Sequence, residues 1–181
     1  MTFLNDPFFW ALISMLGLVG ACSVVGTKKV GRNPILGFFI VTIFVLGRVI
    51  LVLPFCHQPR FDIGGLHGVF GGIIFASGLI FALVPAFMIK ALNVAEKKME
   101  LTTTGFYGIV RNPIYLGEVL WCLGWAIIHR SLIGVTMVPL WWVGLLILIL
   151  IEEESLEREL GQSYFEYKKR VGGRIIPGLP I

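Results

Sequence analysis

Five long apolar runs, separated by short polar segments, constrain the fold of this chain more than any other feature of its sequence. The runs are Phe8–Val25, Ile35–Phe55, Gly68–Ile89, Ile114–Ile128 and Leu132–Ile151. A helix needs about 20 residues to cross the hydrocarbon core of a bilayer; four runs reach that length, and Ile114–Ile128 is shorter. None of the runs alternates like a membrane strand. The sequence therefore predicts an all-α integral membrane protein with about five transmembrane helices, the last two forming a hairpin.

The composition agrees with a membrane protein. Of 181 residues, 56% are hydrophobic and 14% are charged, whereas a soluble domain has about 25% charged residues. The three cysteines, Cys22, Cys56 and Cys122, lie at or inside apolar runs, with neither metal-ligand spacing nor a disulfide framework. We therefore expect them to be small core residues, and we expect no bound metal.

The basic residues predict how the chain is oriented. Of the 15 Lys and Arg residues, 12 lie in the segments 26–34, 90–113 and 152–181, whereas Arg60 and Arg130 lie on the opposite side. Basic residues concentrate on the cytoplasmic side of a membrane, so we expect the N-terminus outside and the C-terminus in the cytoplasm. This bias and contact with anionic lipid account for the net charge of +4 without a nucleic-acid partner.

A first polar motif opens the fourth run. Asn112 suits the N-cap of a helix and Pro113 suits its first turn, so Arg111 would lie beside free backbone N–H groups and the positive end of the helix dipole. Such a position suits a carboxylate or another small anion. The same residues also suit a simple helix cap with an arginine that extends to the membrane surface.

A second motif follows the fifth run. Glu152, Glu153 and Glu154 come directly after twenty apolar residues, on the side that otherwise concentrates positive charge. Beside Arg111 they would form a dipolar pocket suited to a zwitterion such as an amino acid, or they could simply mark where the helix leaves the bilayer. The long connection Lys90–Val110 on the same side is expected to be a functional loop.

The tail carries an apolar stripe. From Ser155 onward, one face of a helix would carry Leu156, Leu160, Tyr164, Tyr167 and Val171. With basic residues on the other face, this pattern predicts a C-terminal amphipathic helix along the cytoplasmic interface, which could act as a lid over both motifs.

Two ionisable residues lie inside the apolar runs, where such residues are functional candidates by default. Glu118 lies about one turn into the fourth run, and Arg48 lies in the second. Glu118 shares a helix face with Tyr115 and His129, among others. We expect either that Arg48 and Glu118 pair or that Glu118 faces the reacting site.

Together the motifs resemble a known family. Arg-x-Pro-x-Tyr-x-Gly (111–117), a hydrophobic hairpin, Glu-Glu-x-x-Leu (152–156) and Gly-x-x-Tyr-x-x-Tyr (161–167) resemble the isoprenylcysteine carboxyl methyltransferases. Residues 112–117 and 123–131 also resemble phosphatidylethanolamine N-methyltransferase. These families form one superfamily of membrane methyltransferases. The resemblance covers roughly Leu101 to Pro180, and the first three helices match only as hydrophobic spans.

The resemblance implies an S-adenosylmethionine site at the cytoplasmic interface, roofed by the tail. The cofactor-binding residues it implies are Gly105, Tyr107, Arg111, Asn112, Tyr115, Gly117, Glu152 and Glu153, with Gly78 as a looser match. The expected catalytic residues are Arg111, Glu152 and Glu118. The chain departs from the family at Asn112, where a His is usual, and at Leu148, where the prenylcysteine enzymes tend to have an Arg.

This resemblance predicts two units and a function. Residues 1–100 would form helices one to three with a cytoplasmic connector, and residues 101–181 the cofactor-binding hairpin with its lid. The expected reaction is methyl transfer to a lipid or lipidated acceptor, first the carboxylate of an isoprenylcysteine-like substrate. An ethanolamine phospholipid is the alternative, because Leu148 removes a cation and Glu118 could take a proton from an amine. Two other classes remain: an NADPH-dependent sterol-type reductase, for which no extra basic cluster is visible, and a non-catalytic membrane scaffold.

Overall fold

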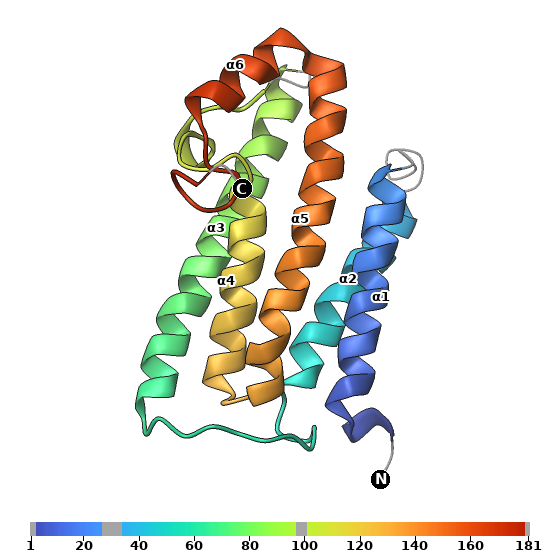
Figure 1. Cartoon of the computed structure of the whole chain (residues 1–181), viewed down its shortest axis with the longest axis vertical. Coiled ribbons are helices and arrows are strands. Elements are labelled where there is room, and N and C mark those ends of the chain that lie inside the picture. The colour runs from blue at the N-terminus through green and yellow to red at the C-terminus, as the bar shows by residue number, and fades with distance from the viewer. Residues whose placement is uncertain (1–2, 27–33, 97–100, 180–181) are drawn as a thin grey trace.

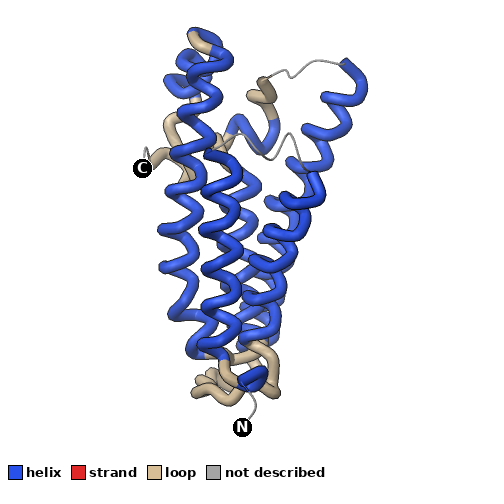
Figure 2. Tube along the Cα trace, turned by 90° about the vertical axis from the view of Figure 1, so that its right-hand side faces the viewer, coloured by secondary structure: helices blue, strands red, loops and turns tan. Residues whose placement is uncertain are grey.

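The computed structural model describes residues 3–26, 34–96 and 101–179, and within them the regular structure is helical (Figures 1 and 2). The α-helices are α1 (Pro7–Gly26), α2 (Pro34–Leu51), α3 (Leu66–Glu96), α4 (Pro113–Ile128), α5 (Leu132–Leu160) and α6 (Gln162–Arg170). Two short 3-10 helices, η1 (Phe3–Asn5) and η3 (Gly105–Gly108), accompany them. The predicted all-α fold is confirmed. The basic residues expected in segments 27–33 and 97–100 lie outside the described residues.

Three helices are long and apolar enough to cross a membrane: α1, α3 and α5. The apolar helices α2 and α4 are shorter. The short fourth helix was expected, but the second run was predicted to be helical as far as Phe55, and α2 ends at Leu51. Pro54 explains this early end, because proline disfavours helical geometry at the residue before it and cannot donate a backbone hydrogen bond.

The polar segments also differ from the prediction. Helix α3 continues to Glu96, so much of the expected loop Lys90–Val110 is helical. Helix α5 continues through the acidic motif and ends at Leu160. The prediction of a single, separate tail helix that begins at Ser155 is therefore wrong. Gly161 separates α5 from α6. Its φ of 53° is a left-handed geometry, which interrupts the helix and favours glycine. The apolar stripe nevertheless packs: Tyr164, Tyr167 and Val171 form a small buried cluster.

Helices α3, α4 and α5 lie side by side, with α1 and α2 on the other side of α5 (Figure 1). Helix α6 and the segment after it lie at the end of the bundle where α4 begins, and Arg60 lies at the opposite end. There its guanidinium donates to the carbonyl groups of Val52, Leu53, Cys56 and His129. The two ends of the bundle are therefore structurally distinct.

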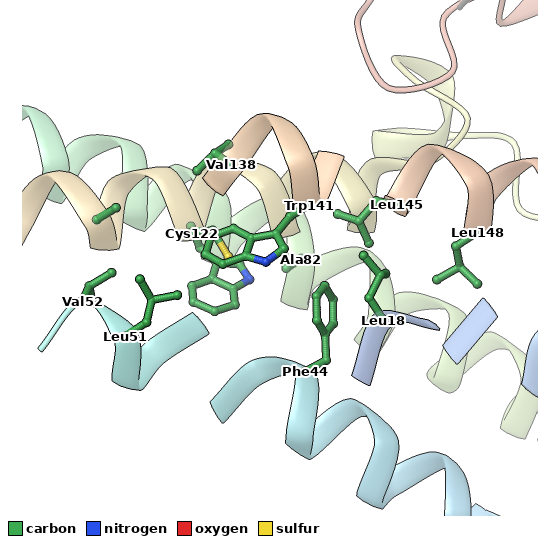
Figure 3. Close-up of a cluster of buried hydrophobic side chains, with 12 residues drawn as sticks. Leu18, Phe44, Leu51, Val52, Ala82, Cys122, Val138, Trp141, Leu145 and Leu148 are labelled. Atoms are coloured by element: carbon green, nitrogen blue, oxygen red, sulfur yellow. The ribbon is translucent and has the colours of Figure 1, made fainter. Parts of the chain in front are cut away.

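The core lies where α1 and α2 meet α4 and α5 (Figure 3). Trp141 of α5 is buried there, and its indole N–H donates to the Ser14 hydroxyl of α1 over 2.9 Å. Cys56 and Cys122 are buried, Cys22 is half-buried, and all three are free thiols, as expected for small packing residues.

Candidate functional site

Arg111 is the centre of a buried polar cluster at the start of α4. Its Nε donates to Glu153 Oε1 over 2.9 Å, and its Nη1 donates to the carbonyl groups of Val171 and Gly172 over 2.9 and 2.8 Å. The expected approach of Arg111 to the acidic motif is therefore confirmed. The two groups do not line an open dipolar pocket, however, because the guanidinium and the Glu153 carboxylate bond each other in a buried pair.

The chain after α6, which we call the tail strap (residues 171–175), is held on this cluster. The backbone N–H groups of Arg111 and Asn112 donate to the carbonyls of Gly173 and Arg174 over 2.9 and 3.0 Å. Asn112 occupies the N-cap position of α4, but its side chain does not cap the helix. Its amide instead donates to Glu153 Oε1 over 3.1 Å, and Arg174 Nε donates to Oε2 over 3.0 Å. Glu153 thus joins α5, α4 and the tail strap.

The neighbouring carboxylate, Glu152, points elsewhere. Successive residues of a helix are rotated by about 100°, so Glu152 does not share the surroundings of Glu153. It lines the same space as Tyr115 of α4. The acidic motif therefore serves two places: Glu153 binds the tail strap, and Glu152 lines a groove on the other side of α4.

That groove, here called the helix groove, lies between α1, α2, α4 and α5 and has a volume of about 630 Å³. Its polar lining consists of Arg48, Tyr115, Glu118 and Glu152, and the remaining lining residues are apolar or glycine. At its inner end Arg48 Nη2 lies 2.6 Å from Glu118 Oε2, which confirms the expected pair. Arg48 also donates to Cys122 Sγ over 3.0 Å and to the Phe44 carbonyl over 3.3 Å.

A second space, the tail cavity, lies between the end of α3, the segment before α4, the end of α5 and α6. Its volume is about 190 Å³. The polar residues in its lining are Thr102, Tyr107, Arg111, Glu159, Tyr164 and Tyr167. Of these, Tyr107 and Arg111 were expected in a site. The two later tyrosines were expected in the packing stripe and in the Gly-x-x-Tyr-x-x-Tyr motif but not as site residues, and Thr102 and Glu159 were not predicted at all.

The tyrosines of the tail cavity are uncharged at neutral pH. Burial raises the pKa of Tyr107 to about 12, and the charge of Glu152 adds to the rise. Burial likewise raises the pKa of Tyr164 and of Tyr167. The Tyr167 hydroxyl donates to the Tyr107 carbonyl over 2.8 Å. The charge of Glu152, a residue of the helix groove, therefore affects the pKa of a residue in the tail cavity.

The remaining predicted glycines have packing or turn roles. A Cβ at Gly78 would lie 2.2 Å from the Trp121 nitrogen, and one at Gly117 would lie 2.2 Å from the Ala82 nitrogen. Both glycines therefore allow α3 and α4 to pack backbone to backbone. Gly105 has a φ of 61° at the start of η3, a conformation that favours glycine.

Comparison with known proteins identifies the family. The sequence model of the phospholipid methyltransferase family matches residues 65–163, more than half of the chain. A curated relative is the delta(14)-sterol reductase TM7SF2 of Mus musculus, 31% identical over 84 residues. That stretch covers 43% of this chain but only 19% of the reductase. No solved structure matches the chain.

The family match also extends the resemblance seen in the sequence. It begins at residue 65, so it includes α3, which the motifs had left as a plain hydrophobic span. It ends at residue 163, where α6 begins, so α1, α2 and the tail strap lie outside it. The chain therefore belongs to the phospholipid methyltransferase family of membrane methyltransferases, within the superfamily that also holds the isoprenylcysteine carboxyl methyltransferases and the C-terminal region of sterol reductases.

Proposed function

We propose that this protein transfers a methyl group from S-adenosylmethionine to the amine of a membrane lipid. In this proposal the tail cavity holds the cofactor and the helix groove holds the lipid. The observation that carries it is the position of α4 between the two spaces. Arg111 lines the tail cavity, and Tyr115 lines the helix groove. Arg111 lies two residues before α4 and Tyr115 lies in its first turn, so both spaces lie beside the start of this helix.

The tail cavity has the chemistry that the cofactor requires. Apolar side chains of α3 and α5 and the neutral rings of Tyr107 and Tyr164 suit an adenine base. The Glu159 carboxylate can accept hydrogen bonds from ribose hydroxyls or from an ammonium group. At about 190 Å³ the cavity encloses only part of such a ligand, because ligand pockets usually measure about 300–1,000 Å³. The rest of the molecule would lie outside the enclosed space.

The charges around the helix groove favour an amine over a carboxylate as acceptor. The buried arginines Arg48 and Arg111 are already paired with Glu118 and Glu153. Glu152 lines the groove beside Tyr115. An ammonium headgroup would be attracted to it, whereas the carboxylate of an isoprenylcysteine would be repelled. This argument supports the alternative that the sequence motifs had left second.

The bound cofactor supplies an electrophilic methyl group, and the protein must align the acceptor and exclude water. An ammonium group must lose a proton before its nitrogen can act as a nucleophile. Glu152 is the group we assign to accept that proton. Glu118, expected as a catalytic residue, is instead assigned to hold Arg48.

We also propose how the protein is oriented in the membrane and which part of the chain forms each site. With α6 and the tail strap in the cytoplasm, a water-soluble cofactor reaches the tail cavity directly, and the lipid enters from the bilayer. Residues 101–181 then supply most of the cofactor site, and residues 1–100 supply the outer wall of the lipid groove through α1 and α2.

The first test is calorimetric titration of S-adenosylhomocysteine into the full chain in lipid nanodiscs. Binding is expected, and Glu159→Gln should weaken it roughly 10- to 100-fold, the value of a hydrogen bond to a charged group. Glu154→Gln is the matched control, because it makes the same charge change at another exposed position of α5 that does not line the tail cavity. Absence of binding by a folded wild type would contradict the proposal, and binding of NADPH in its place would support a reductase.

The second test separates the acceptors. Methyl transfer from labelled S-adenosylmethionine should be faster to phosphatidylethanolamine than to farnesylcysteine. Glu152→Gln should retain S-adenosylhomocysteine binding but lower kcat by roughly 100- to 10,000-fold, the usual contribution of a general base. Faster transfer to farnesylcysteine would contradict the amine acceptor and support a carboxylate acceptor.

A further inference from the structure

The helix groove has a definite length. On α2 its lining extends from Gly37, near the end of the bundle that carries Glu152, to Arg48. Eleven residues of helix measure about 17 Å. Half of the hydrocarbon core of a bilayer measures about 15 Å. The groove therefore spans roughly one leaflet.

A closed layer ends the groove. The Arg48 guanidinium lies 3.6 Å from the ring centre of Phe44 and 4.7 Å from that of Trp121, and it bonds Glu118. Beyond this layer the helices meet in the packed core of Figure 3, where Leu51 and Trp141 are buried. A chain that enters the groove beside Glu152 cannot extend past this point without displacing packed side chains.

The walls of the groove differ in character. The wall formed by α2 offers apolar side chains such as Phe38, Val41 and Val45, whereas Tyr115 and Glu118 line the opposite side. A buried charge pair near the middle of a membrane is costly. Arg48 lies outside the segment that matches the family, whereas Glu118 lies inside it. The pair thus joins α2, which lies outside the matched segment, to the methyltransferase hairpin.

We infer that the helix groove binds one hydrocarbon chain of the acceptor lipid and that the Arg48–Glu118 layer, as the floor of the groove, selects the length of that chain. The inference rests on the proposed lipid acceptor. The amine lies at the mouth, beside Glu152, and the chain lies along α2. Because the lipid chain comes from the bilayer and not from water, the selection is steric: a chain that fits above the floor allows the amine to lie beside Glu152, whereas a longer chain does not.

The first experiment raises the floor. Val45 lines the groove one turn above Arg48, and Val45→Phe fills its lower part. The neighbouring Leu46 is 46% exposed on the outer side of α2, so Leu46→Phe is the matched control. With ethanolamine lipids of increasing chain length, Val45→Phe should move the optimum of kcat/KM to shorter chains, whereas Leu46→Phe should leave it in place. An identical profile in both variants, with normal binding of S-adenosylhomocysteine, would overturn the inference while leaving the methyltransferase function intact.

The second experiment needs no catalysis. A phosphatidylethanolamine with a diazirine at the end of one acyl chain is photolysed in nanodiscs, and the labelled peptides are mapped. Labelling should concentrate at the floor, on Phe44, Val45 or Leu145, and Val45→Phe should reduce it several-fold. Labelling spread evenly over the outer faces of α1 and α2 would overturn the inference, whether or not the protein transfers a methyl group.

Discussion

At the scale of single residues, the most informative feature is the different position of two adjacent carboxylates. Glu153 is 3% exposed and bonds Arg111, Asn112 and Arg174. Glu152 faces the helix groove instead. One acidic pair therefore combines a structural clamp with a carboxylate that lines a groove.

The clamp can be tested by Glu153→Gln. This change leaves two guanidinium groups facing a neutral amide, and breaking a buried ion pair costs about 3–5 kcal/mol. We expect a large fall in the unfolding temperature, measured by tryptophan fluorescence in detergent. Glu154→Gln at the exposed neighbouring position should change it little. Equal stability of the two variants would show that the clamp does not stabilise the fold.

A pH effect is expected at the opposite end of the bundle. Burial lowers the pKa of the His129 imidazole, and the nearby Arg60 guanidinium lowers it further. The folded state therefore favours neutral His129, so its stability is complete above the unfolded pKa of about 6.5 and falls as the pH drops through that value. Between pH 7 and pH 5 the unfolding temperature should fall more in the wild type than in His129→Gln. Parallel pH curves would rule out this role.

At the scale of elements, the contact between α3 and α4 depends on glycines. Gly78 and Gly117 meet the backbone of the opposite helix, and Gly124 meets Phe75 in the same way. Close backbone approach is a common way for membrane helices to associate. Lipid tails are as apolar as the side chains, so the hydrophobic effect does not favour helix–helix contacts over helix–lipid contacts. The glycines therefore hold α4, and with it Arg111 and Tyr115, in position.

This packing predicts different results for two glycines of the same helix. Gly78→Ala would put a methyl group 2.2 Å from the Trp121 nitrogen, so it should destabilise the protein by about 1–3 kcal/mol. A methyl group at Gly72 would have nothing within 4 Å, so Gly72→Ala should be neutral or stabilising by up to about 1 kcal/mol. Thermal unfolding of both variants in the same detergent measures the difference, and equal losses would contradict the close contact.

At the scale of the whole molecule, two groups of helices meet. Helices α1 and α2 pack on each other, and α3 and α4 do the same, while α5 touches both groups. Polar links across the boundary include Arg48 with Glu118 and the Trp125 indole N–H with the Val49 carbonyl. The helix groove lies along this boundary, so the arrangement of the two groups determines its shape.

The Arg48–Glu118 link predicts a non-additive pair of substitutions. Arg48→Met leaves a charge without its partner, so it should cost about 3–5 kcal/mol, and Glu118→Leu should cost a similar amount. The double variant replaces the pair by apolar side chains of similar size, so its stability should return to within about 1 kcal/mol of the wild type. A double-mutant cycle of unfolding free energies measures this coupling. Additive losses of stability would mean that Arg48 and Glu118 contribute to stability independently of each other.

Much of the candidate site was accessible from local patterns. Pro113 predicted where α4 begins, and the acidic motif and Arg111 were expected at the same end of one hairpin. The pair of Arg48 and Glu118 was one of two alternatives, because a charge inside an apolar run needs a partner or a function, and the structure shows the pair. The ends of α2 and α5 were harder to predict. Pro54, beyond the end of α2, and Gly161, directly after α5, determine where these helices end.

The sequence by itself determined that this chain is a helical membrane protein, that Arg111 and the acidic motif lie at the same end of the hairpin, and which family the motifs resemble. These properties depend on hydropathy and on the order of residues along the chain. Only the tertiary structure decided that Glu152 and Glu153 serve different spaces, that Gly117 is a packing residue, and that α2 forms a wall of the groove. The physical reason is that each residue turns a helix by about 100°, whereas the neighbour that a face meets depends on how apolar helices cross. Hydrophobicity alone does not specify that crossing within lipid.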